Sequence, residues 1–159
     1  MKEITEQGAF LQLSAYCAQA EHCQHEVLEK MRRWELSAEA QARIMAKLVE
    51  GRYVDDERYA RAFVKDKIRY NKWGRRKVEQ ALWQKRISSD ICRRVLDEVS
   101  DEEYLSVLCP LIRQKRRATR AANAYELNQK VLRYALGRGF TIDLIRQCMD
   151  VDDAADEDY

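Results

Sequence analysis

Apolar residues recur every three or four positions along almost the whole chain, and the alternation of apolar and polar residues that marks a half-buried strand is absent. The pattern predicts nine helices. The first spans residues 5–21, with Phe10 and Ala20 on its apolar face, and the second spans residues 24–34. Hydroxyl or acidic residues stand where most of the later helices begin, as N-caps do. The sequence therefore indicates an all-α protein.

Internal repetition groups these helices into three similar units. Segments that begin at Val27, Val78 and Val131 align without gaps, at offsets of 51 and 53 residues. In each segment an apolar residue at a turn is followed by a hydroxyl residue that can cap the next helix. These pairs are Leu36–Ser37, Ile87–Ser88 and Phe140–Thr141.

A repeat of this kind predicts helical units that stack on one another. We expect three tandem three-helix bundles, helix-turn-helix-like, that form an elongated, curved array. The expected domains are residues 1–54, 55–99 and 100–149, followed by an acidic, disordered tail at 150–159.

Turn-forming residues are scarce, with five glycines and one proline. This scarcity argues against a β-sandwich or barrel, and no glycine-rich phosphate-binding motif occurs. Gly51 lies just past the third predicted helix, where a left-handed C-cap suits glycine. Pro110 falls within the seventh helix and marks either a kink or the first turn of that helix.

The five cysteines are odd in number and contain no CxxC pair, so we expect reduced thiols and not a disulfide framework. Cys17, His22, Cys23 and His25 cluster within nine residues and suggest zinc as an alternative. Their spacing fits no standard zinc site, however, and a buried thiol and a helix cap explain the two cysteines. We expect no metal and no cofactor.

Motifs for catalysis are also missing. The chain has two histidines and no nucleophile-elbow sequence, and its acidic pairs begin helices, where they complement the helix dipole. We therefore expect no enzyme. No apolar segment approaches the roughly 18–20 residues that span a bilayer, and the N-terminal residues lack a secretion signal. We expect a cytoplasmic protein without membrane contact.

The net charge of +2 hides an uneven distribution. The last ten residues contain six acids and no base, so residues 1–149 carry +8. A basic body suggests an anionic partner, and the acidic tail either competes for the same surface or only keeps the chain soluble.

Two basic clusters stand out in this body. They are the candidate binding residues Lys65, Lys67, Arg69, Lys72, Arg75, Arg76 and Lys77, and Arg113, Lys115, Arg116, Arg117 and Arg120. Such clusters suit nucleic-acid phosphates or an acidic protein groove, although a solvated helix face explains either cluster alone. Trp73 in the first cluster either stacks on a base or plugs the helix junction, and the plug is favoured because exposed tryptophan is uncommon.

Three segments carry a resemblance to a known family. Asp55-Asp56-Glu57-Arg58-Tyr59-Ala60, followed by Trp73-Gly74-Arg75-Arg76-Lys77 and Leu82-Trp83-Gln84-Lys85-Arg86-Ile87, resembles the RecX family of bacterial regulatory proteins. The likeness extends from about Leu11 to Met149. Arg86 departs from the family pattern, which has glycine at this turn, and Cys23 replaces a serine cap.

The resemblance implies a non-enzymatic modulator of RecA that lies in the groove of the RecA–single-stranded-DNA filament. It would inhibit the recombinase, ATPase and coprotease activities of RecA and so regulate DNA repair, recombination and the SOS response. The expected partners are the RecA filament and single- or double-stranded DNA, contacted by a monomer. The alternative is a stand-alone DNA-binding protein built from helix-turn-helix-like repeats.

Overall fold

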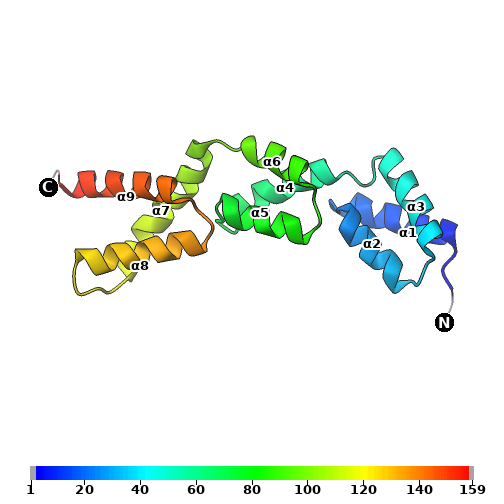
Figure 1. The fold of residues 1–159 in the computed structure, drawn as a ribbon, viewed down its shortest axis with the longest axis horizontal. Coiled ribbons are helices and arrows are strands. Elements are labelled where there is room, and N and C mark those ends of the chain that lie inside the picture. Colours follow the sequence, from blue (N-terminus) through cyan, green and yellow to red (C-terminus); the bar gives the residue numbers. More distant parts are fainter. Residues whose placement is uncertain (1–2, 158–159) are drawn as a thin grey trace. The chain divides into compact units, whose positions relative to one another are not determined.

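The computed structural model describes the backbone of residues 3–157 and the side chains of residues 3–150. Over residues 3–157 the chain folds into nine α-helices and no β-strand, which confirms the predicted all-α repeat fold (Figure 1). The helices are α1 (Glu6–Gln19), α2 (Gln24–Arg33), α3 (Ala38–Glu50), α4 (Asp56–Arg69), α5 (Arg75–Gln84), α6 (Ser89–Asp97), α7 (Asp101–Ala118), α8 (Ala124–Gly137) and α9 (Ile142–Glu157). Contacts divide the chain into two compact units, Met1–Phe63 with Leu82–Cys92, and Val64–Ala81 with Arg93–Tyr159.

Helices α1, α2 and α3 form a bundle within the first unit, in which α3 packs against the other two (Figure 1). Its buried core consists of Ala9, Leu13, Cys17, Val27, Met31, Ile44, Leu48 and Val54. The predicted face of α1 was partly wrong. Ala9 takes the fully buried position, whereas Phe10 is half-buried with its ring edge-on to Tyr53, and Ala20 is exposed because α1 ends at Gln19.

The same turn closes the second helix of each triplet. The backbone is left-handed at Glu35 (φ 56°), Arg86 (φ 60°) and Gly139 (φ 94°), which are the equivalent positions of the three repeats. In each case the next residue donates its N–H to the carbonyl five residues back, which is the Schellman pattern. The apolar residue of the turn is buried at Ile87 and Phe140 and half-buried at Leu36.

The predicted caps of α3 and α6 are confirmed. Ser37 Oγ accepts the Ala40 N–H at 3.1 Å, and Ser88 Oγ accepts the Ile91 N–H at 3.3 Å. The prediction for Gly51 was wrong, because Gly51 has an ordinary φ of −79° and the left-handed residue is Arg52, at 60°. The Schellman hydrogen bonds place the left-handed conformation one residue later than the sequence suggests.

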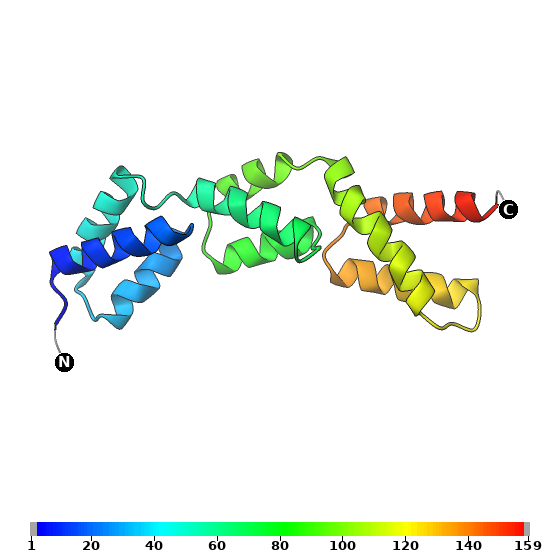
Figure 2. The same ribbon diagram turned by 180° about the vertical axis from the view of Figure 1, so that it is seen from behind.

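Helices α7, α8 and α9 form a second bundle, in which all three pairs of helices are in contact (Figure 2). Its buried residues include Tyr104, Leu108 and Ile112 from α7, Val131 and Ala135 from α8, and Leu144, Ile145 and Cys148 from α9. Helix α9 continues to Glu157, so most of the acidic segment is helical in its backbone where disorder was predicted. Asp158 and Tyr159 lie outside the described residues.

A disulfide joins Cys109 of α7 to Cys148 of α9. The expectation that all five cysteines are reduced was therefore wrong for this pair, whereas Cys17, Cys23 and Cys92 are buried thiols outside this disulfide. The helix α7 runs continuously through Pro110, which thus lies inside the helix and not in its first turn.

Candidate nucleic-acid and protein interface

The first basic cluster lies on the end of α4, the loop of residues 70–74 and the start of α5. Lys65, Arg69, Lys72 and Arg76 are exposed, and the other three members are half-buried. The first turn of α5 contains no acid. Three consecutive bases at Arg75–Lys77 therefore stand at the positive end of the helix dipole, which is electrostatically unfavourable. The helix dipole therefore does not account for these three bases.

The turn between α8 and α9 holds this loop in place. The Gly74 N–H donates to the Arg138 carbonyl at 2.8 Å, and the Arg76 N–H donates to the Gly139 carbonyl at 3.0 Å. The Arg138 guanidinium donates in return to the Lys72 carbonyl at 3.0 Å and to the Asn71 carbonyl. Two orphan N–H groups of α5 are thus satisfied, and the loop backbone is fixed from both directions.

Trp73 lies inside this arrangement. Its ring is half-buried, with Lys67 Nζ 5.1 Å and Lys77 Nζ 4.9 Å from the ring centroid. The Trp73 N–H donates to the Lys67 carbonyl at 3.1 Å. These contacts support the plug interpretation, because two cations from α4 and α5 already occupy positions over the indole.

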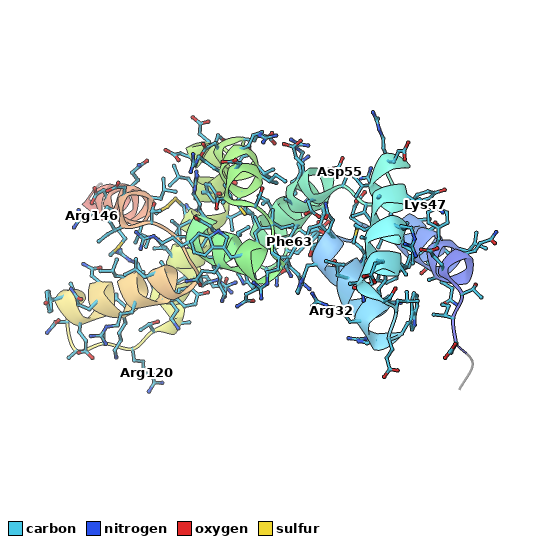
Figure 3. The ribbon with its side chains drawn as sticks, turned by 45° about the vertical axis from the view of Figure 1, so that its right-hand side comes forward. Arg32, Lys47, Asp55, Phe63, Arg120 and Arg146 are labelled. Carbon is cyan, nitrogen blue, oxygen red and sulfur yellow. A yellow bond between two sulfur atoms is a disulfide. The ribbon has the colours of Figure 1, made fainter. Side chains whose placement is uncertain are left out.

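The second basic cluster lies on the C-terminal half of α7 and the loop that follows. Arg113, Arg117 and Arg120 are exposed, and Arg120 extends away from the α7–α8 loop (Figure 3). Arg116 is half-buried and donates to the Asn128 side-chain oxygen at 2.8 Å. Lys115 Nζ lies 4.7 Å from the centroid of the Tyr134 ring. Lys115 and Arg116 therefore also hold α8 against α7.

Arg138 connects the two clusters, although it was not among the candidate binding residues. Its guanidinium carbon lies 5.7 Å from the Tyr134 ring that Lys115 also contacts, while its nitrogens hold the loop of the first cluster. A signal was present in the sequence, because Lys85 places a cation at the equivalent turn position of the preceding repeat. Arg75 has a structural role of its own, an ion pair with Asp97 at 2.6 Å.

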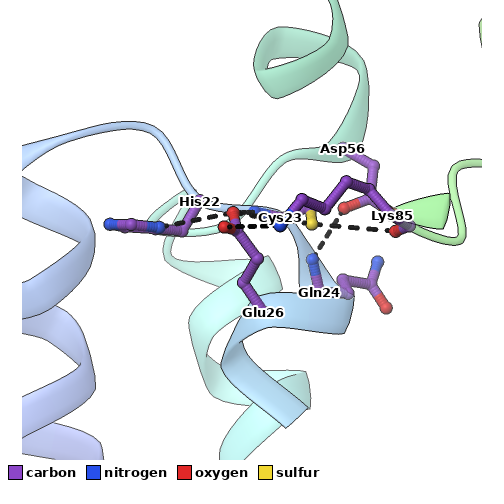
Figure 4. Close-up of polar contacts among 6 residues, drawn as sticks. All are labelled: His22, Cys23, Gln24, Glu26, Asp56 and Lys85. Atoms are coloured by element: carbon purple, nitrogen blue, oxygen red, sulfur yellow. Dashed lines mark hydrogen bonds and ion pairs between the residues drawn. The ribbon is translucent and has the colours of Figure 1, made fainter. Parts of the chain in front are cut away.

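An equivalent junction joins the first and second repeats inside the first unit. Offsets of 51 and 53 residues relate Cys23 to Gly74 and Lys85 to Arg138. The Cys23 thiol lies 3.7 Å from the Lys85 carbonyl oxygen, and Lys85 Nζ lies 3.3 Å from Glu26 Oε2 (Figure 4). The Gln24 N–H donates to Asp56 Oδ1 at 2.8 Å. The first and second repeats thus use the same position for contact with the next repeat: Cys23 contacts a backbone carbonyl through its thiol, and Gly74 contacts one through its backbone N–H.

This junction also bears on the zinc alternative. Burial raises the pKa of the Cys23 thiol to about 11, which favours the neutral thiol over the thiolate that zinc requires. The Cys23 Sγ faces Glu26 and the Lys85 carbonyl, and His22 stacks on Tyr16. Among residues 3–150 no three histidine, cysteine or acidic side chains lie close enough together to hold a metal ion.

These features define a class, an all-α protein of tandem three-helix repeats with a basic surface around the loop 70–74. Two RecX family models match it in sequence: that of the second three-helix domain at residues 55–96 and that of the third three-helix domain at residues 101–149. The chain belongs to the RecX family.

Several curated relatives named regulatory protein RecX are similar in sequence. The protein of Lactobacillus gasseri is 29% identical over 136 residues, which cover 84% of this chain and 50% of the relative. The protein of Lactobacillus johnsonii is 32% identical over 120 residues, 76% of this chain and 44% of the relative. That of Bacillus cytotoxicus is 26% identical over 144 residues, 91% and 53%. The chain spans about half the length of these relatives.

Two solved structures share the fold. The crystal structure of RecX from Lactobacillus salivarius has a TM-score of 0.87 and 18% sequence identity, and the match covers 94% of this chain and 97% of that one. A second crystal structure of a regulatory protein RecX has a TM-score of 0.84 and 21% identity, with coverage of 91% and 73%. No helix within residues 3–157 is both long enough and apolar enough to cross a membrane.

Proposed function

We propose that this protein binds the RecA–single-stranded-DNA filament and inhibits the recombinase, ATPase and coprotease activities of RecA, and so regulates DNA repair and recombination. Membership of the RecX family and the name of its curated relatives support a regulatory role. In this proposal the protein acts by binding and not by catalysis, as a cytoplasmic monomer without a cofactor.

The observation that carries the proposal is the fixed basic loop of the second unit. Lys72 and Arg76 are exposed, while their backbone is held by the carbonyls of Arg138 and Gly139 and by the Arg138 guanidinium. A loop that is already ordered loses little conformational freedom when it binds, which favours affinity. Its cations suit either the phosphates of the filament DNA or acidic side chains of RecA.

Charge reversal at exposed residues tests the proposal. We expect the double variant Lys72→Glu, Arg76→Glu to need a roughly tenfold higher concentration than wild type for half-inhibition of RecA ATPase on single-stranded DNA. The matched control is Arg32→Glu, Arg33→Glu, which changes the net charge by the same amount at two exposed residues of α2. Equal inhibition by wild type and the loop variant would show that the loop is not part of the interface. Failure of the wild type to inhibit RecA would refute the proposed function.

The stand-alone DNA-binding alternative makes a different prediction. It requires submicromolar binding to bare duplex DNA without RecA, with an affinity that falls steeply as salt rises. Titration of the protein against preformed RecA filaments, and separately against bare duplex DNA, distinguishes the two functions.

A further inference from the structure

A tyrosine on the basic loop is presented to solvent, although the loop itself is fixed. Tyr70 directly follows α4 and is 71% exposed. Its N–H donates to the Asp66 carbonyl at 2.8 Å, which continues the helical hydrogen bonding into the loop. On the other side of Tyr70, the carbonyls of Asn71 and Lys72 are held by Arg138. The backbone that carries the ring is therefore held on both sides.

The surroundings of the ring are cationic. The Arg69 guanidinium carbon lies 5.6 Å from the Tyr70 ring centroid, and Lys65 and Lys72 are exposed on the same segment. Asp66 is the one acid among residues 65–77. An exposed aromatic side chain alone needs no explanation. An aromatic ring on a fixed loop among cations, however, has the composition of surfaces that stack bases and neutralise the adjoining phosphates.

Tyr125 is a useful contrast within the same unit. It is 74% exposed at the start of α8, but the residue beside it is Glu126, whose carboxylate accepts the Ala122 N–H and pairs with Lys130. Trp73 differs in the opposite way, because it is half-buried between Lys67 and Lys77. Of these three aromatic side chains, Tyr70 combines exposure with a cationic setting.

We propose that Tyr70 is a stacking platform for a base of single-stranded DNA, with Arg69 and Lys72 placed to contact the flanking phosphates. Double-stranded DNA fits this role poorly, because its bases are stacked on one another and their faces are not available. The inference rests on the proposed function for the source of the strand, which would be the DNA of the RecA filament.

The test separates base stacking from phosphate contact. Fluorescence anisotropy at fixed low salt would compare a labelled oligothymidylate with an abasic oligonucleotide of equal length, which carries the same phosphates without bases. We expect wild type to prefer the oligothymidylate. Since stacking of one base on an aromatic ring contributes about 1–3 kcal/mol, Tyr70→Ala should lower the affinity for the oligothymidylate by a factor of about 5 to 150. Its affinity for the abasic strand should stay within about twofold of wild type.

Three variants make the result specific. Tyr70→Phe should bind as wild type because it retains the ring, and Tyr125→Ala should also bind as wild type. The double variant Lys72→Glu, Arg76→Glu should weaken binding to both oligonucleotides. Circular dichroism should give the same helical content for Tyr70→Ala and wild type, because the ring is exposed.

Two results would overturn the inference: equal binding of the two oligonucleotides by wild type, or unchanged oligothymidylate binding by Tyr70→Ala. Neither result decides whether the protein inhibits RecA, because inhibition is measured separately by ATP hydrolysis. Conversely, a wild type that binds the oligothymidylate through Tyr70 but leaves RecA unaffected would refute the proposed function and retain the stacking platform.

Discussion

Gly74 and Gly139 lie against each other where the loop after α4 meets the turn after α8. A Cβ atom added to Gly74 would lie 2.4 Å from the Gly139 carbonyl carbon and 2.3 Å from the Phe140 nitrogen. A Cβ added to Gly139 would lie 2.5 Å from the Lys77 nitrogen. The absence of side chains at both positions allows the two backbones to approach closely enough for the hydrogen bonds from Gly74 and Arg76.

The first prediction concerns this contact. Gly74→Ala should lower the free energy of unfolding by about 3 kcal/mol, because its methyl group would overlap backbone atoms that cannot rotate away. Gly137→Ala is the matched control, since nothing lies within 4 Å of its added Cβ. Because alanine favours the helix, this control should be neutral or stabilising by up to about 1 kcal/mol. Urea denaturation measures both, and an unchanged midpoint for Gly74→Ala would contradict the packing described.

The second prediction concerns the left-handed residue of the middle repeat. Arg86 has a φ of 60°, a conformation that costs a residue with a side chain about 1–2 kcal/mol. Arg86→Gly relieves this cost, but the greater conformational freedom of glycine in the unfolded chain offsets part of the gain. The variant should therefore be more stable than wild type by a net ~0.5–1 kcal/mol. Arg93→Gly, in the middle of α6, should instead destabilise by about 1 kcal/mol. Thermal denaturation should give shifts of opposite sign, and a loss of stability in both variants would argue against strain at Arg86.

The third prediction concerns the disulfide. The bond between Cys109 and Cys148 joins residues 39 positions apart, so its reduction should remove about 4 kcal/mol of stability by the chain-entropy estimate. Wild type should therefore melt at a lower temperature in dithiothreitol. Cys109→Ala should melt at the same temperature with and without the reductant. Sensitivity of this variant to dithiothreitol would show that the effect arises elsewhere in the protein.

The fourth prediction concerns pH at the junction between the first two repeats. Burial opposes ionisation of Glu26, but the Cys23 N–H and the Lys85 ammonium outweigh it, so the pKa of Glu26 is lowered. A lowered pKa in the folded state stabilises the protein above the unfolded-state pKa near 4.5, and this contribution is lost as the pH falls through the folded-state pKa.

Glu26→Gln tests this dependence. The variant should be less stable than wild type at neutral pH. The difference in stability should shrink as the pH falls below about 4.5 and through the folded-state pKa of Glu26. Glu29→Gln changes a more exposed carboxylate on the same helix, so its stability should differ little from that of wild type at both neutral and acidic pH. A gap between Glu26→Gln and wild type that stays constant down to pH 2 would contradict the assignment.

The fifth prediction concerns the acidic segment. Deletion of residues 151–159 removes five acids and changes the net charge from +2 to +7. If the segment competes for the basic surface, the shortened chain should bind single-stranded DNA more tightly at low salt, and the difference should disappear at high salt. Unaltered affinity at low salt would leave the segment a role in solubility alone.

The sequence by itself determined the helical repeats and their turns. Helical spacing of apolar residues and the pairs Ile87–Ser88 and Phe140–Thr141 depend on neighbours within a few positions, so local chemistry specifies them. The position of the two basic clusters followed in the same way. The exposure of individual residues did not follow in this way. Phe10 is only half-buried because packing against α3 decides which side of α1 is buried, and Ala20 is exposed because α1 ends at Gln19.

Only the tertiary structure decided which distant residues meet. Cys109 reaches Cys148, and Arg138 reaches the loop at Asn71 and Lys72, because the packing of separate helices brings them together. The same packing covers Trp73 with two lysines and leaves Tyr70 in solvent. Spacing along a chain sets which face of a helix a residue occupies, whereas contact across a repeat junction depends on how those faces are brought together in space.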